Sequence, residues 1–287
     1  MYAIIGITGQ VGRVTANLLL EKKLPVRAVV RDPAKGAEWK NSGAEVAIAE
    51  LHDANALQAA FHNTAGVFVM TPPLFDSIDP AKDHNRMLHA LVTAINKAKP
   101  KKVVYLSSVG AHLSGGTGAI KKLYDMEQAF SKLTMPTASI RAAWFMENFA
   151  GNISYAKETG KLPSFLNPPD LPVEMIAAKD IGKRAALLLE ENWSGHRTIE
   201  LAGPCKYSAN DVAYVLSYQL NRPVSADIIP AEQYVASYQS FGFTPAAAKM
   251  MAEMNNGFNS GHIVFEQAGQ EQVRENTLLE DALNSFI

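Results

Sequence analysis

The sequence has little of what marks secreted or membrane-spanning proteins. It contains one cysteine, Cys205, so an internal disulfide is impossible and a reducing cytoplasm is the expected location. No apolar run reaches the roughly 18 residues that a membrane-spanning helix needs. The first residues also lack the basic segment of a signal peptide. We therefore expect a cytoplasmic protein that does not bind a membrane.

An excess of charge of either sign is also absent. Lys and Arg number 27 against 28 Asp and Glu, for a net charge of -1. The densest basic stretch, from Lys97 to Lys102, is more typical of a solvated helix end, so direct nucleic-acid binding is not expected. The seven histidines show no metal-ligand spacing. We predict no metal site.

Glycine is present where a nucleotide site would need it. An apolar run from Tyr2 leads into Gly6, Gly9 and Gly12, and an amphipathic segment at 14–23 follows. Glycine permits a sharp turn, a close approach of pyrophosphate to the backbone and tight packing of helix on strand. The N-terminal N–H groups of the helix would point at the phosphates. This strand–turn–helix context predicts a dinucleotide site.

Short apolar segments alternate with helical ones over the first half of the chain. Strands are expected at 26–30, 45–49, 66–70, 102–106 and 137–141, with helices near 53–62, 80–98 and 118–133. This alternation predicts an α/β fold with a doubly wound parallel sheet of the Rossmann type.

The pattern loosens after Trp144, where a smaller C-terminal α/β lobe is expected. We predict a proline-rich loop at 160–172, a strand at 173–178 and a helix capped by Asp180. Further helices are predicted at 207–221, 230–241 and 244–256. Residues 1–150 would form the dinucleotide-binding domain, with 179–201 returning to it. Residues 151–178 and 202–287 would form the smaller, substrate-binding lobe.

The end of the second strand bears on which dinucleotide is bound. An acidic side chain there would bind a ribose 2′-OH, whereas a cation would bind a 2′-phosphate. The sequence places Arg31, Asp32 and Lys35 at this point. Asp32 precedes Pro33 and is suited to cap the next turn. NADP(H) is therefore favoured over NAD(H), unless Arg31 pairs with a surface carboxylate instead.

Several motifs together resemble the NmrA-like family, a branch of the atypical short-chain dehydrogenase/reductases. They are Gly6-Ile-Thr-Gly-Gln-Val-Gly12, Val30-Arg-Asp-Pro33, Val67-Phe-Val-Met-Thr-Pro-Pro73, Leu106-Ser-Ser-Val-Gly110 and Phe145-Met-Glu-Asn-Phe149. The resemblance spans nearly the whole chain and is strongest to NADPH:quinone oxidoreductase-like members.

The resemblance implies where NADP(H) would be held. The turn would meet the pyrophosphate, Arg31 with Lys35 nearby the 2′-phosphate, and the segment after the fourth strand the nicotinamide half. The implied cofactor residues are Gly6, Thr8, Gly9, Gln10, Val11, Gly12, Arg31, Lys35, Met70, Thr71, Pro72 and Ser107.

The usual catalytic pair of short-chain dehydrogenases is incomplete here. A Tyr-x-x-x-Lys motif places an ammonium beside a proton-donating tyrosine on one helix face, but Tyr124 is followed by Gln128. The basic residue that the NmrA-like branch often carries four positions before a glutamate is also replaced, by Leu123. Lys121 and Lys122, on the preceding turn, are the alternative cations for Tyr124, although neither replaces the motif.

Tyr124, Ser108 and Asn148 are the candidate catalytic residues, each with a structural alternative. Tyr124 could pack or form a substrate wall, Ser108 could cap the chain leaving the sheet, and Asn148 could cap a short helix. Trp144, Phe145 and Phe149 would form either an apolar wall for a flat acceptor or packing between lobes.

Two functions are consistent with these observations. One is an NADP(H)-dependent oxidoreductase that transfers hydride to a small planar acceptor such as a quinone, where solvent can supply the proton. The other is a non-catalytic NADP(H)-sensing regulator that contacts a protein partner. A nucleotide-sugar epimerase is less favoured, because that chemistry relies on the missing Tyr/Lys pair.

Overall fold

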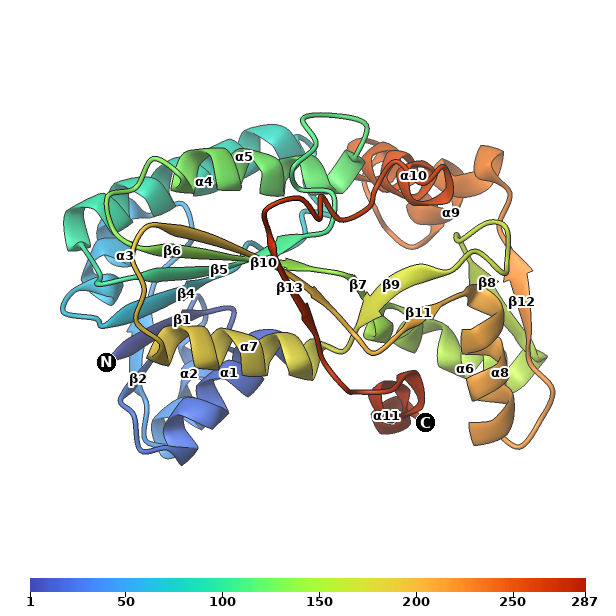
Figure 1. Cartoon of the computed structure of the whole chain (residues 1–287), viewed down its shortest axis with the longest axis horizontal. Helices are drawn as coiled ribbons and strands as arrows, with labels where there is room; N and C mark the ends of the chain where they lie inside the picture. The colour runs from blue at the N-terminus through green and yellow to red at the C-terminus, as the bar shows by residue number, and fades with distance from the viewer.

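Eight parallel strands form the main sheet of the computed structural model, which describes residues 1–287 (Figure 1). Their spatial order is β13-β10-β6-β5-β4-β1-β2-β3. The order reverses between β1 and β4, which confirms the doubly wound α/β fold. The strands are β1 (Tyr2–Ile5), β2 (Val26–Val30), β3 (Glu45–Ile48), β4 (Gly66–Val69), β5 (Val103–Ser108), β6 (Thr137–Ala142), β10 (His196–Ala202) and β13 (Glu271–Arg274).

Helices cover both faces of this sheet. One face carries α3 (Ala54–Phe61), α4 (Pro80–Ala98) and α5 (Lys121–Phe130), and the other carries α1 (Gln10–Glu21), α2 (Pro33–Asn41) and α7 (Ala178–Glu190) (Figure 1). Side chains alternate between the two layers. Ala3 and Ile5 of β1 belong to the core that includes α3 and α4, while Ile4 belongs to the core that includes α1 and α7. Burial on both faces explains the nearly continuous apolar strands.

The smaller lobe contains two short sheets, ordered β11-β9-β7 and β12-β8. These strands are β7 (Trp144–Phe145), β8 (Lys161–Ser164), β9 (Val173–Ile176), β11 (Lys206–Tyr207) and β12 (Ser225–Ile228). The helices are α6 (Ile153–Thr159), α8 (Ala209–Gln219), α9 (Tyr234–Ser240), α10 (Pro245–Asn259) and α11 (Leu279–Leu283), with the 3-10 turns η1 (Gly118–Ile120), η2 (Met146–Asn152), η3 (Ala231–Gln233) and η4 (Asn284–Phe286). None of the helices is both long and apolar enough to cross a membrane.

Two sequence-based expectations about elements are corrected. The segment 160–172 is not entirely loop, because Lys161–Ser164 pairs with Ser225–Ile228. The C-terminal segment is not confined to the smaller lobe, because β13 pairs with β10 at the edge of the main sheet. Pairing between such distant segments leaves no local pattern in the sequence.

The predicted cap of α7 is also wrong. The Glu147 carboxylate accepts the Ala178 N–H at 2.9 Å, at the start of the helix. Asp180 lies buried in the first turn of α7, where it accepts from the Lys183 ammonium at 2.8 Å and the Thr277 N–H at 3.3 Å. Asp180 therefore ties α7 to the C-terminal segment.

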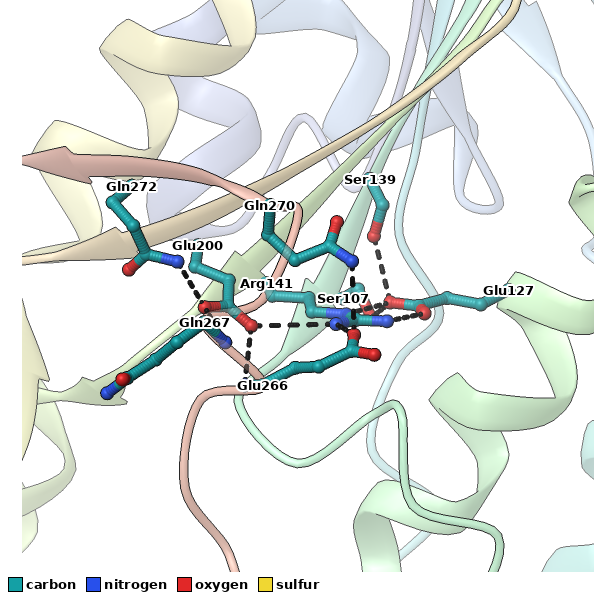
Figure 2. Close-up of polar contacts among 9 residues, drawn as sticks. All are labelled: Ser107, Glu127, Ser139, Arg141, Glu200, Glu266, Gln267, Gln270 and Gln272. Atoms are coloured by element: carbon teal, nitrogen blue, oxygen red, sulfur yellow. Dashed lines mark hydrogen bonds and ion pairs between the residues drawn. The ribbon is translucent and has the colours of Figure 1, made fainter.

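A buried arginine joins the main sheet to α5 and to the C-terminal segment. Figure 2 shows Arg141 of β6 pointing between the carboxylates of Glu127, Glu200 and Glu266. Arg141 donates to Glu127 at 2.8 and 3.0 Å and to Glu266 at 2.6 Å. Burial disfavours the charge, but the hydrogen bonds that Arg141 donates to Glu127 and Glu266 outweigh it and raise the pKa of Arg141. The guanidinium is therefore a permanent cation.

The carboxylates of this cluster accept further hydrogen bonds. Glu200 is fully buried and accepts the N–H groups of Glu266 and Gln267 at 2.8 and 3.1 Å. The Gln272 amide also donates to it. These bonds hold the chain that leads into β13 against β10 (Figure 2).

We expect Arg141→Met to lower the free energy of unfolding by about 3–5 kcal/mol, because it leaves buried carboxylates without a cation. Urea denaturation followed by circular dichroism measures the loss. Arg197→Met is the matched control, since Arg197 pairs with Glu191 and Glu271 near the surface and should contribute below about 1 kcal/mol. Equal losses in the two variants would contradict the assignment.

Candidate active site

The glycine turn brings the start of α1 against the end of β1. Gly6 has φ +72°, and a Cβ on it would lie 2.3 Å from the Met70 sulfur. A Cβ on Gly12 would lie 2.3 Å from the Gly6 carbonyl oxygen. Gly9 caps α1 without a side chain, so the first N–H groups of the helix have no side-chain acceptor. The turn therefore presents bare backbone donors, which is an arrangement suited to phosphate.

A cavity of about 390 Å³ opens beside this turn, and we call it the glycine-loop cavity. Of the predicted cofactor residues, it is lined by Gly6, Thr8, Gly9, Arg31, Lys35, Met70 and Pro72. Gln10, Val11 and Gly12 form the first turn of α1, with Val11 and Gly12 buried. Thr71 is buried between Met70 and Pro72, and its hydroxyl has no hydrogen-bond partner.

Arg31 and Lys35 are exposed and form no ion pair. No carboxylate therefore pairs with Arg31, which was the alternative to its binding a 2′-phosphate. Asp32 accepts the Ala34 N–H at 2.9 Å and caps α2. Its carboxylate is engaged with the backbone, as the sequence indicated.

Ser107 does not lie where the resemblance implied. Its side chain is buried, does not line the glycine-loop cavity, and donates to Glu127 at 2.6 Å. It belongs to the Arg141 cluster (Figure 2). The sequence could not show this hydrogen bond, because Glu127 lies on α5, 20 residues further along the chain.

A second cavity of about 330 Å³ lies between the two lobes, and we call it the methionine cavity. Its walls come from the loop after β4, from α4, from α5, from η2 and from α10. They include Pro73, Leu74, Phe75, His84, Lys121, Lys122, Asp125, Asn148, Met250, Met251 and Met254. Mostly apolar walls with a few polar groups are typical of small-molecule sites.

The two cavities adjoin at the loop that follows β4. Pro73 lines both of them, and Met70 and Pro72 line the glycine-loop cavity on its other side. The Lys122 ammonium donates to the Pro72 carbonyl at 3.0 Å and so ties α5 to this loop. A ligand reaching along the glycine-loop cavity would therefore end beside the methionine cavity.

The three candidate catalytic residues are not brought together. Asn148 lines the methionine cavity, whereas Tyr124 and Ser108 line neither cavity. The Lys121 ammonium lies 5.0 Å from the centre of the Tyr124 ring and also pairs with Asp125. Gln128, at the position of the missing lysine, is exposed.

The aromatic residues after β6 pack against the cores of the two lobes and do not line the methionine cavity. Phe149 is buried in the core of that lobe, and Trp144 makes an edge contact with Phe258. Phe145 packs against the core of the main domain. Of the two interpretations of this group, packing is the one observed, and the cavity wall comes from methionines of α10.

Two polar groups of the methionine cavity, His84 and Lys122, were not predicted as site residues from the sequence. His84 of α4 is buried, neither ring nitrogen has a hydrogen-bond partner, and burial beside the Lys122 charge lowers its pKa to about 4. Burial lowers the pKa of Lys122 to about 8. His84 is therefore neutral at pH 7, and Lys122 exchanges protons near physiological pH.

A contact between lobes closes the outer side of this cavity. Phe75 stacks on Phe243 with ring centres 4.2 Å apart. Thr244, which caps α10, donates its N–H to the Phe75 carbonyl at 2.9 Å and its hydroxyl to the Ser77 carbonyl at 2.6 Å. The loop after β4 is thereby fastened to the start of α10.

Comparison with known proteins agrees with this geometry. The parallel sheet, its reversal point and the glycine turn define a Rossmann-type nucleotide-binding protein. The chain belongs to the NmrA-like family, whose model matches residues 2–278.

Individual relatives match most or nearly all of the chain. An NAD(P)H azoreductase of Xenophilus azovorans is 29% identical, over 88% of this chain and 86% of its own. An Escherichia coli NADPH-dependent quinone oxidoreductase, solved with NADPH, has a TM-score of 0.81 at 22% identity, covering 99% of both chains. A Citrobacter triphenylmethane reductase, solved with NADP(H), has a TM-score of 0.81 at 19% identity, covering 100% and 99%.

The α10 wall of the methionine cavity rests directly on Gly118. This glycine has φ +51°, and a Cβ there would lie 1.9 Å from the Met250 carbonyl oxygen. We expect Gly118→Ala to destabilise the protein by about 2 kcal/mol or more, through backbone strain and displacement of α10. Thermal unfolding measures it.

Gly115→Ala is the control for this prediction, because no atom lies within 4 Å of a Cβ at that position. It should change stability by less than about 0.5 kcal/mol. The assignment fails if Gly118→Ala is as stable as Gly115→Ala.

Proposed function

We propose that the protein is an NADP(H)-dependent oxidoreductase that reduces a small, flat aromatic acceptor such as a quinone. The observation that carries this proposal is the junction of the two cavities at Pro73. A dinucleotide in the glycine-loop cavity would bring its reactive end to the wall of the methionine cavity. Proximity of this kind is what hydride transfer requires.

The residues of the glycine-loop cavity fit NADP(H). The first turn of α1 offers unpaired N–H groups for the pyrophosphate, and Gly6 and Gly12 keep the approach free of side chains. Arg31 and Lys35 are free to bind a 2′-phosphate, while Asp32 is engaged as a cap.

When bound, NADPH supplies a hydride, and the chain's own residues handle orientation and the proton. The methionine side chains of α10 are flexible and polarizable, so they can adapt to flat rings of different shape. Lys122 lies on the cavity wall, held by the Pro72 carbonyl, and its ammonium can stabilise or protonate the acceptor atom that gains negative charge. Asn148 also lines this cavity, and its amide can orient the acceptor.

The relatives support a reductase of aromatic acceptors. They are named for azo compounds, quinones and triphenylmethanes, which all carry aromatic or quinoid rings. An adaptable apolar cavity with few polar groups suits such compounds better than it suits sugars. An epimerase is less favoured, because Tyr124 and Ser108 line neither cavity and Gln128 replaces the catalytic lysine.

The experiment that tests this function mixes purified protein and NADPH with a panel of quinones and azo dyes. We expect acceptor-dependent loss of nicotinamide absorbance with at least one of them. Tight NADPH binding without turnover of any acceptor would contradict the proposal.

A non-catalytic NADP(H) sensor is the second candidate, favoured by the exposed Gln128 in place of the catalytic lysine. A sensor would bind oxidised and reduced cofactor with different affinity and change its lobe arrangement without turnover. Titration with both forms, followed by small-angle scattering, separates this case from the first. Equal affinities with an unchanged scattering curve would exclude the sensor.

The role of Arg31 gives a prediction for cofactor choice. We expect Arg31→Ala to weaken NADPH binding roughly 10- to 100-fold, because a charge-assisted hydrogen bond to phosphate is lost. NADH binding should change less than about threefold, since NADH has no 2′-phosphate. Fluorescence titration of both cofactors measures the difference.

Lys40→Ala is the matched control, because Lys40 is an exposed cation on α2 that does not line the cavity. It should leave both affinities unchanged. A parallel loss of NADPH and NADH affinity in Arg31→Ala would show that Arg31 does not bind the 2′-phosphate.

The lowered pKa of Lys122 gives a prediction for pH dependence. Burial places this pKa at about 8, so the ammonium is present below pH 8 and is lost above it. We expect kcat to fall as pH rises through 8, and Lys122→Met to be slower by about 10-fold or more with no inflection there. Steady-state rates from pH 6 to 9.5 measure both profiles.

Lys121→Met serves as the control, because Lys121 lines the same cavity but pairs with Asp125. This variant should retain the inflection near pH 8. An unchanged profile in Lys122→Met would remove Lys122 from the proton step.

A further inference from the structure

His84 is a buried histidine that the fold itself does not use. It lies in the first half of α4 and is 3% exposed, and neither of its ring nitrogens makes a hydrogen bond of standard geometry, although the Lys122 backbone lies near the ring. An unpaired buried polar group lowers stability, and an apolar side chain would pack there without that loss. The sequence therefore keeps a hydrogen-bonding ring at a position where packing alone does not need one.

The surroundings of His84 point to a ligand. The imidazole borders the methionine cavity together with Lys122 and Asp125 of α5, and other parts of the wall are apolar side chains such as Met250 and Leu74. Rotation of an imidazole about its Cβ–Cγ bond is soft, so a small turn presents either nitrogen to the cavity. A neutral imidazole offers one donor and one acceptor.

We infer that His84 is the residue that recognises an oxygen substituent on the aromatic acceptor, by a hydrogen bond from or to its neutral imidazole. The ligand class is a flat bicyclic or smaller aromatic ring that carries a hydroxyl or a carbonyl group. The ring would lie against the apolar walls, and its oxygen would satisfy the orphaned nitrogen. This inference rests on the proposed function, since it names the polar feature of the acceptor.

The charges near His84 keep the imidazole in the required form. Lys121 and Lys122 both disfavour a second positive charge, whereas Asp125 favours it and is itself paired with Lys121. Burial is the largest influence and also favours the neutral ring. The Lys122 backbone favours the charged ring but is outweighed, so His84 is neutral at pH 7, and a neutral ring accepts as well as donates.

The test compares two ligands that differ by one hydroxyl group. Binding of 2-naphthol and of naphthalene to the intact protein is measured by fluorescence titration without cofactor, for the unmodified protein and for His84→Phe and His84→Gln. We expect the unmodified protein to prefer 2-naphthol by about 10-fold or more. His84→Phe should bind naphthalene normally but lose the preference, and His84→Gln should keep most of it because an amide also donates and accepts.

Normal naphthalene binding by His84→Phe shows that the cavity has kept its shape, so loss of the preference cannot reflect misfolding. If naphthalene binding is lost as well, His84→Gln decides: a retained preference supports the inference and a lost one overturns it. The inference is overturned if the unmodified protein shows no preference, or if His84→Phe keeps it. It is also overturned if Lys122→Met alone abolishes the preference, since the ammonium would then be the partner.

Failure of the proposed function has a different signature. The ligand titration needs neither NADPH nor turnover, so it reports on His84 even in a protein that reduces nothing. Conversely, the protein could reduce quinones while His84→Phe keeps the preference for 2-naphthol. That result would support the reductase function and overturn only the role of His84.

Discussion

The buried guanidinium of Arg141 is the interaction on which the arrangement of this molecule depends. It lies on a central strand, and its carboxylate partners come from α5, from β10 and from the segment before β13 (Figure 2). A buried charge must be paired, so these elements have few other ways to pack. One cation thereby positions the edge of the main sheet and the helix that carries the lysines of the methionine cavity.

The site follows from this placement. Glu127, on the buried face of α5, is held by Arg141, while Lys122 on the same helix reaches the Pro72 carbonyl in the loop after β4. That loop is also fastened to α10 through Thr244. The methionine cavity is thus framed by contacts from both lobes, and its polar groups are few. The apolar walls of such a cavity favour flat ligands, and Lys122, Asn148 and His84 can bind polar groups on those ligands.

Much of the glycine-loop cavity, the proposed cofactor site, was predictable from the sequence. Glycines at 6, 9 and 12 and cations at 31 and 35 lie within single strand–turn–helix units, and local patterns describe such units well. The acceptor half was not predictable. Tyr124 and Ser108 sit at the expected positions along the chain but line neither cavity, and Ser107 is held by a carboxylate from another element. A long-range partner leaves no mark on local periodicity.

The sequence by itself determined the alternation of strands and helices, the glycine turn and the free cations beside it, because backbone propensity and spacing act over a few residues. Tertiary structure decided that β13 joins the main sheet and that Glu147 rather than Asp180 caps α7. It also decided that His84 is buried without a partner beside Lys122. Each of these depends on which distant segments exclude water together, and that is settled only when the chain packs.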